Sequence, residues 1–178
     1  MFFKQMQTRR SIRKFTDQSV DKQTIDRLIE AALRAPSSRD FRPWRFIVVD
    51  QPDLLEKLAD AKPHGASFLK NAPLGIVVCG DTDASDVWVE DCAIASTFIH
   101  LAAHDLGLGS CWIQIRKRDR SPDKTADAYI KDLLDIPDNM AVESIIALGY
   151  PDETKSGHSK TALAYDKVFF NHFGKAMP

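Results

Sequence analysis

The segment of the chain most suggestive of chemistry is a basic run close to its start. Arg9, Arg10, Ser11 and Arg13 lie within five residues, and Lys14 follows them. Arginine guanidinium groups bind phosphate oxygens bidentately, and a serine hydroxyl adds a shorter contact to the same group. The run therefore indicates a phosphate site. Two alternatives stay open, a solvated basic face and a nucleic-acid surface.

A second candidate binding segment is the loop of residues 36–43, which has a proline at each end. Its first three residues, Pro36, Ser37 and Ser38, directly follow an apolar helical pattern. Turn chemistry accounts for them by itself, because proline ends a helix and serine hydroxyls satisfy free backbone groups. Loops at the ends of elements also concentrate ligand contacts, so a binding role stays open.

Few other groups in the chain suggest chemistry. His100 and His104 are four residues apart, which can present two metal ligands on one helix face, but no H-E-x-x-H pattern or third ligand accompanies them. We expect a partly buried structural pair and no metal. Gly107 and Gly109 follow a helix, whereas a dinucleotide fingerprint precedes one. The sequence has no G-x-S-x-G elbow or Walker loop, so hydrolase and NTPase functions lack their machinery.

Composition limits the classes of function. The chain has 178 residues, of which 44% are hydrophobic, and this suits a single domain over residues 1–178. Its formal net charge of −1 gives no overall attraction to nucleic acids or anionic membranes. The three cysteines are widely spaced and odd in number, which fits a reducing cytosol. No apolar stretch approaches the ~20 residues of a membrane span, so we expect a soluble cytoplasmic protein.

Helix and strand patterns alternate along the chain up to residue 150. Apolar residues spaced three and four apart predict helices, and short β-branched and aromatic runs predict strands. The expected helices span about residues 21–35, 52–61, 86–106 and 125–134, and the expected strands span 44–49, 74–79, 110–115 and 144–148. Asp21 and Asp86 are the expected N-caps, and Gly107 is expected to follow the long helix. This order indicates a layered α/β or α+β fold.

The tail of residues 152–178 has no regular pattern, but it carries many large apolar side chains. They are Leu163, Tyr165, Val168, Phe169, Phe170 and Phe173. Such a segment needs a surface to cover it, either the body of its own chain or a partner subunit. We favour the partner subunit and expect residues 152–178 to be a C-terminal arm.

Taken in order, these segments resemble the nitroreductase family. The similarity covers nearly the whole chain in register. It rests on RRSIRKF at 9–15, APSS at 35–38, PWRF at 43–46, NAPLGIVV at 71–78, LGLGSCWI at 106–113 and LGYP at 148–151. The resemblance implies an α+β fold with a mixed β-sheet flanked by helices. It also implies an intertwined homodimer with FMN at the subunit interface.

The resemblance also implies roles for particular residues. Arg9, Arg10, Ser11 and Arg13 would hold the FMN phosphate and the polar edge of the isoalloxazine. Lys160 stands where the family often has a basic residue that also reaches the phosphate. The basic run would then be one half of a phosphate clamp whose other half is Lys160.

The contacts to the flavin ring would come from two subunits. Residues 36–38 of the other subunit would line the ring. Trp112, Ile113 and Gln114 match the segment that passes beside flavin N5, where a backbone N–H donates a hydrogen bond.

The chain departs from the family pattern in the loop of residues 36–43. Asp40 stands where the family often has asparagine, so it keeps an acceptor for flavin N3–H but loses the donor of an amide. Arg42 replaces a frequent glutamine and adds a charge near the pocket. The chain is also short for the family and lacks insertions that cover the site in larger members, so we expect a more open pocket.

The activity that the resemblance implies is ping-pong transfer of hydride from NADH or NADPH, through FMN, to a small oxidised acceptor such as a nitroaromatic or a quinone. The cofactor carries the chemistry, which agrees with the lack of a side-chain nucleophile motif. Two alternatives remain. One is a flavoenzyme of the same fold that performs reductive dehalogenation or flavin breakdown. The other is a non-catalytic FMN-binding or redox-sensing protein.

Overall fold

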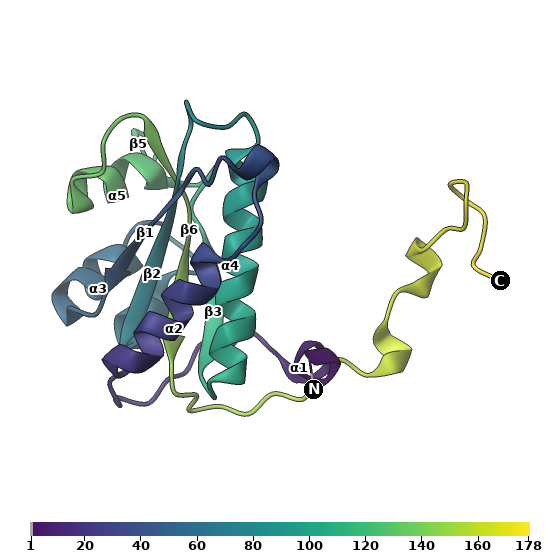
Figure 1. The fold of residues 1–178 in the computed structure, drawn as a ribbon. Coiled ribbons are helices and arrows are strands. Elements are labelled where there is room, and N and C mark those ends of the chain that lie inside the picture. The colour runs from purple at the N-terminus through teal and green to yellow at the C-terminus, as the bar shows by residue number, and fades with distance from the viewer. Residues whose placement is uncertain (1) are drawn as a thin grey trace.

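The computed structural model describes residues 2–178. Four strands form an antiparallel sheet in the order β1-β2-β6-β3 (Figure 1). They are β1 (Trp44–Val49), β2 (Leu74–Asp81), β6 (Met140–Gly149) and β3 (Gly109–Gln114). The central strands β2 and β6 are buried on both faces, which explains their nearly continuous apolar sequences.

Helices cover both faces of this sheet (Figure 1). One face carries α2 (Lys22–Leu33) and α4 (Trp88–Asp105), whose apolar residues share a core with Ile76 and Ile146. The opposite face carries α3 (Pro52–Ala59) and α5 (Ala126–Leu134), which pack on Ile145. Alternate strand residues point to opposite faces, so the sheet divides the apolar interior into two cores.

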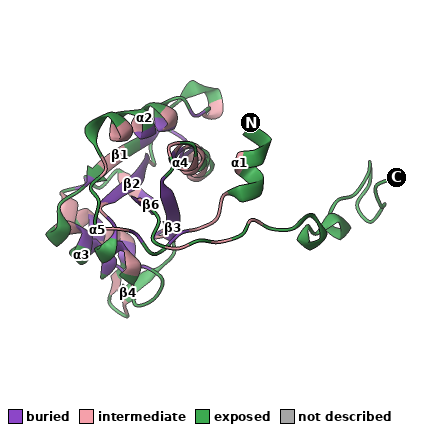
Figure 2. Ribbon diagram, turned by 90° about the horizontal axis from the view of Figure 1, so that it is seen from below, coloured by how far each residue is buried: buried purple, intermediate pink, exposed green. Residues whose placement is uncertain are grey.

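The remaining elements lie at the margins of this body. They are α1 (Phe2–Thr8), the 3-10 helices η1 (Ser38–Asp40) and η2 (Ser67–Asn71), and a small hairpin of β4 (Asp119–Ser121) and β5 (Lys124–Thr125). Beyond residue 152 the chain leaves the body as an extended arm with two short 3-10 helices, η3 (Lys160–Ala162) and η4 (Tyr165–Lys167). Figure 2 shows that this arm is exposed along most of its length.

Most expected elements are present, and the α+β class is confirmed. The named strands pair antiparallel throughout, and the parallel contact found within residues 2–178 is a single bridge between Ser11 and Ser110. Asp21 caps α2 by accepting from the backbone N–H of Thr24 at 2.9 Å. Gly107 follows α4 with a φ of +78°, in the left-handed region that glycine tolerates.

Other expectations about the elements were wrong. Asp86 does not cap α4, because the helix begins at Trp88 after Val87, whose side chain makes no capping bond. Thr125 is not the first helical residue but the N-cap of α5. No helix within residues 2–178 has the length and apolarity that crossing a membrane requires.

Candidate functional site

The basic segment of residues 9–13 lies against the first residues of β3. Ser11 bridges Ser110, and the Ile12 N–H donates to the carbonyl of Ser110 at 3.0 Å. Gly109 allows this approach, because a Cβ at that position would lie 2.7 Å from Cγ2 of Ile12. The buried Ile12 anchors the segment in the core, and the charged residues on either side are left at the surface.

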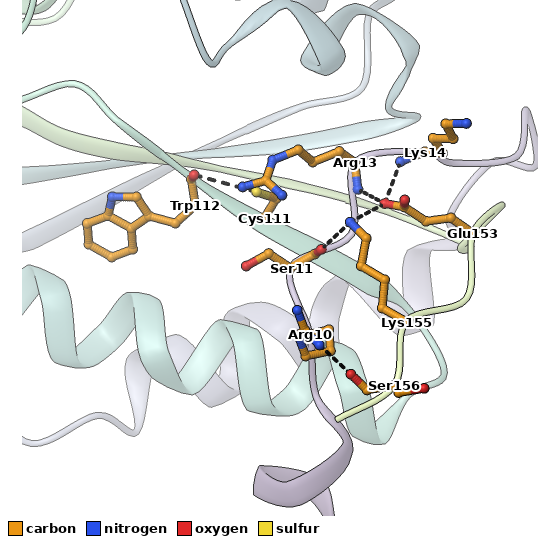
Figure 3. A network of polar contacts seen from close by, with 9 residues as sticks. All are labelled: Arg10, Ser11, Arg13, Lys14, Cys111, Trp112, Glu153, Lys155 and Ser156. Atoms are coloured by element: carbon orange, nitrogen blue, oxygen red, sulfur yellow. Dashed lines mark hydrogen bonds and ion pairs between the residues drawn. The ribbon is translucent and has the colours of Figure 1, made fainter. Parts of the chain in front are cut away.

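The first residues of the C-terminal arm hold the same segment from its other side (Figure 3). Oε1 of Glu153 accepts from the backbone N–H groups of Arg13 and Lys14 at 2.6 and 3.3 Å. Nζ of Lys155 donates to the Ser11 carbonyl at 3.0 Å and to Oε1 of Glu153 at 2.9 Å. The bond from the Arg13 N–H, followed by the bond from Lys155, lowers the pKa of Glu153 to about 2.

The arginine side chains of this segment have no acidic partners. In the part of the chain that the structure describes, no carboxylate oxygen lies within 4.0 Å of the guanidinium groups of Arg9, Arg10 or Arg13. Arg10 donates instead to the carbonyl of Ser156. Arg9, Arg10 and Lys155 line a cavity of about 270 Å³ beside Ser110. Glu153 lines the same cavity, but its carboxylate is bonded to Lys155 and to the Arg13 N–H. The guanidinium groups of Arg9 and Arg10, which no described carboxylate pairs with, fit a phosphate.

Arg13 extends from the basic segment toward β3. Figure 3 shows its guanidinium beside Cys111 and the backbone of Trp112. The same guanidinium lies 5.7 Å from the centre of the Phe68 ring in η2. Arg13 therefore connects the basic segment to the strand in which Trp112, Ile113 and Gln114 were expected to border a flavin.

The side chains of Trp112, Ile113 and Gln114 divide between the two faces of β3. Ile113 is fully buried in the core. The indole Nε1 of Trp112 donates to Oε1 of Gln114 at 2.9 Å, and Nε2 of Gln114 donates to the carbonyl of Arg116 at 3.0 Å. The Trp112 ring also stacks on His100 at a centroid distance of 6.4 Å. These contacts fix both polar side chains at the end of the strand.

The predicted residues Pro36, Ser37 and Ser38 lie elsewhere in the chain. The Ser38 N–H donates to Oδ1 of Asp91 at 2.8 Å, near the start of α4. The basic segment lies near His104, at the other end of this helix. At a rise of 1.5 Å per residue the two sites are about 20 Å apart along the helix axis. A single chain therefore does not bring the loop of residues 36–38 and the basic segment together. This agrees with the resemblance, which assigns them to different subunits.

Asp40 is already engaged within its own loop. Nε and Nη2 of Arg42 donate to its two carboxylate oxygens at 2.6 and 2.9 Å. This bidentate pair raises the pKa of Arg42. Arg39, Asp40 and Arg42 all have φ angles near +50°, an unusual conformation for residues other than glycine. The two departures of the loop from the family pattern thus form one ion pair.

Lys160 does not lie in the cavity that Arg9 and Arg10 line. It is exposed on η3 and lines a groove of about 580 Å³ with Phe3, Met6 and Leu163. Sequence reasoning missed Glu153 and Lys155, the residues of the arm that do contact the basic segment. Their position just after the LGYP stretch was the one feature that could have pointed to them. No sequence pattern near residues 153–155 indicated that the arm runs beside residues 9–14.

The two histidines form separate structural contacts. Nδ1 of His100 lies 2.7 Å from Oγ of Ser110, and Nε2 of His104 lies 2.8 Å from Oγ1 of Thr8. Burial, followed by the charge of Arg9, lowers the pKa of His100 to about 4. Among residues 2–178 no three metal-ligating side chains gather in one place. Each histidine is thus partly buried and makes its own contact with a hydroxyl group.

Known proteins have a similar fold and a similar sequence. The model of the nitroreductase family matches residues 6–65 and 60–150. A protein of Methanothermobacter thermautotrophicus, named for NADH dehydrogenase and NAD(P)H nitroreductase, is 43% identical over 151 residues, which cover 83% of this chain and 76% of that protein. The structure of an FMN-dependent nitroreductase from Clostridium difficile R20291 is 48% identical and has a TM-score of 0.94. The match covers 95% of this chain and 98% of the Clostridium difficile chain.

A nitroreductase family protein from Clostridium novyi NT is 27% identical, with a TM-score of 0.76, and covers 99% of this chain and 96% of its own. The matches extend over both the basic segment and β3, where the candidate site lies. The chain belongs to the nitroreductase family of oxidoreductases.

Proposed function

We propose that this protein is an FMN-dependent NAD(P)H oxidoreductase that works by a ping-pong mechanism. The observation that carries the proposal is the set of arginine side chains at residues 9–13, which are held against β3 and have no carboxylate partner among residues 2–178. A 48% identical relative of matching length is named as FMN-dependent. FMN and a nicotinamide donor are therefore the cofactors that we assign.

The residues of the basic segment bind different parts of FMN. Arg9, Arg10 and Ser11 hold the phosphate, because their N–H and O–H groups match its oxygens in charge and geometry. Lys160 adds a third cation to the phosphate once the arm packs on the partner subunit. Arg13 orients the polar edge of the ring, since its guanidinium already lies beside β3.

The residues of β3 border the reacting edge of the ring. Trp112, Ile113 and Gln114 place a backbone N–H toward N5, and the contacts of Gln114 with Trp112 and Arg116 keep this strand end in position. FMN supplies the hydride chemistry, from NADH or NADPH to a small oxidised acceptor such as a nitroaromatic or quinone. No side chain has to act as a nucleophile.

The complete site requires two copies of the chain. We infer a homodimer with FMN at the interface, in which residues 152–178 of each copy pack on the other. Pro36, Ser37, Ser38 and Asp40 of one copy then line the ring that is bound by the other. The exposed apolar residues of the arm and the separation of this loop from the basic segment support the proposal.

The visible spectrum of the purified protein tests the function. We expect flavin absorbance that anaerobic NADH or NADPH bleaches, and that a quinone or nitroaromatic restores. A protein without flavin absorbance that also fails to bind added FMN would contradict the proposal. Bound flavin that both donors reduce only very slowly would favour a non-catalytic role. Reoxidation preferentially by halogenated phenols or oxygen would favour the other chemistries of this fold.

A further inference from the structure

Two loops meet at the carboxyl end of β3. Residues 60–66 connect α3 to η2, and residues 115–118 connect β3 to β4. Ala61 and Ala66 are buried in the same core as Ile115. Nε of Arg120 also donates to the carbonyl of Asp60 at 3.2 Å. These contacts bring residues that are distant in sequence to one place, directly beyond the segment that we propose borders the flavin ring.

The two loops carry a pair of cations, Lys62 and Arg118. Lys62 is half-buried, whereas Arg118 is exposed. Burial, together with the charge of Arg118, lowers the pKa of Lys62. The loop that carries Arg118 directly continues β3, whose last residue is Gln114. The loops of the pair therefore lie next to the proposed flavin site rather than on a remote surface.

Neither cation is neutralised by the residues around it. Within residues 2–178 no carboxylate oxygen lies within 4.0 Å of the charged groups of Lys62 or Arg118. Two neighbouring cations have partners of other kinds. Lys124 pairs with Asp132 at 2.6 Å, whereas Arg120 has no carboxylate partner among the described residues but its guanidinium lies 4.1 Å from the centre of the Tyr129 ring. Two positive charges close together raise the electrostatic free energy of the site, and a bound anion would lower it again.

The loops limit the freedom of both side chains. Nη1 of Arg118 donates to the carbonyl of Lys117 at 2.9 Å, and the Arg118 N–H closes a turn to Ile115 at 3.0 Å. Nζ of Lys62 folds back over Gly65, 3.8 Å from where a Cβ of that residue would lie. A site whose donors are already positioned loses less entropy when it binds an anion.

We propose that Lys62 and Arg118 bind a phosphate group of the nicotinamide dinucleotide that reduces the protein, an inference that rests on the function proposed above. The acceptors named there, quinones and nitroaromatics, need carry no charge. NADH and NADPH carry a pyrophosphate, and NADPH also carries a 2′-phosphate. A donor whose nicotinamide stacks beside the end of β3 can extend its phosphates toward these loops.

Charge-neutral variants test the proposal by binding. We expect NADP+ to bind the oxidised protein about tenfold more weakly for Lys62→Gln and for Arg118→Gln, because each loses a charge-assisted hydrogen bond. Calorimetry measures the dissociation constants. Lys124→Gln is the matched control, since it removes one positive charge from the neighbouring hairpin where Asp132 already neutralises it.

The rate of flavin reduction separates the two phosphate sources. Loss of rate with both NADH and NADPH identifies the pyrophosphate, whereas loss with NADPH alone identifies the 2′-phosphate. The uncharged donor N-benzyl-1,4-dihydronicotinamide should reduce all variants at the wild-type rate. Unchanged binding of NADP+ in the double variant, equal slowing with the uncharged donor, or equal weakening by Lys124→Gln would overturn the proposal. A wild-type protein that even the uncharged donor fails to reduce would instead contradict the proposed function.

Discussion

At the scale of single residues, Arg9 and Arg13 are the side chains on which FMN binding depends most directly. Their guanidinium groups lie free of carboxylates in the described chain, so a phosphate or a ring oxygen can take their hydrogen bonds. We expect Arg9→Gln and Arg13→Gln each to weaken FMN binding about tenfold, the order of one lost charge-assisted hydrogen bond. Fluorescence titration of the apoprotein with FMN measures this.

The matched control for these variants is Arg34→Gln, which removes an exposed arginine that follows α2 and pairs with Glu30. An equal loss of FMN affinity in Arg34→Gln would show that net charge, rather than the basic segment, governs binding.

Glu153 makes the stability of this site depend on pH. Its pKa is lowered from 4.5 to about 2 by its bonds to the Arg13 N–H and Lys155. A carboxylate whose pKa falls on folding stabilises the fold fully above its unfolded value, and this contribution is lost as the pH falls through the folded value. We expect Glu153→Gln to lower the free energy of unfolding at pH 7. Its unfolding free energy should also fall less steeply than the wild-type value between pH 4.5 and 2.

Urea unfolding at a series of pH values measures both effects. Parallel curves for Glu153→Gln and the wild type across this acid range would mean that the bonds of Glu153 do not stabilise the fold.

At the scale of elements, the contact between β3 and the basic segment depends on one missing side chain. A Cβ at Gly109 would lie 2.7 Å from Cγ2 of Ile12, so Gly109→Ala must push Ile12 and its flanking arginines outward. Overpacking of this kind costs about 1–3 kcal/mol of unfolding free energy. We expect Gly109→Ala to be destabilised by that amount and to bind FMN more weakly.

Thermal unfolding and FMN titration of Gly109→Ala in two backgrounds test this reading. Ile12→Ala removes Cγ1 and Cγ2, two of the three Ile12 atoms that the new Cβ would meet, so Gly109→Ala should cost less stability and less FMN affinity in an Ile12→Ala background than in the wild type. An equal cost in both backgrounds would mean that crowding at Ile12 is not the cause.

At the scale of the whole molecule, the C-terminal arm is the feature that a single copy of the chain leaves unexplained. Leu163, Phe170 and Phe173 are 48%, 49% and 93% exposed, and Figure 1 shows the arm extending far from the sheet. We expect the protein to be a dimer of about twice the 20.0 kDa chain mass by light scattering. Phe170→Asp should shift it toward monomer and release FMN, because a charge in an apolar contact is costly.

Phe170→Leu is the control, since it keeps an apolar side chain and should stay dimeric. A wild-type protein that is monomeric with bound FMN would contradict the inferred dimer.

The sequence by itself determined the local elements and the type of ligand. Apolar spacing and turn residues are local properties, so β1 and the cap at Asp21 were predicted at their observed positions. The density of arginine at residues 9–13 made a phosphate site one of three possibilities, and the order of the motifs along the chain, which resembles the nitroreductase family, favoured it over the other two. The predicted N-cap at Asp86 was wrong, because α4 begins two residues later, at Trp88. A side chain that is able to cap a helix does not by itself fix where the helix begins.

Only the tertiary structure decided which distant residues meet. Glu153 lies 140 positions from Arg13, yet it accepts the Arg13 N–H, because β6 carries the chain back beside β3. The loops that carry Lys62 and Arg118 likewise meet at the end of β3, where Ala61 and Ile115 share one core and Arg120 donates to the Asp60 carbonyl. Periodicity reports the face that a side chain occupies, but not its neighbours on other elements. The basic segment could thus be named from its residues, while the partners that hold it depended on the fold.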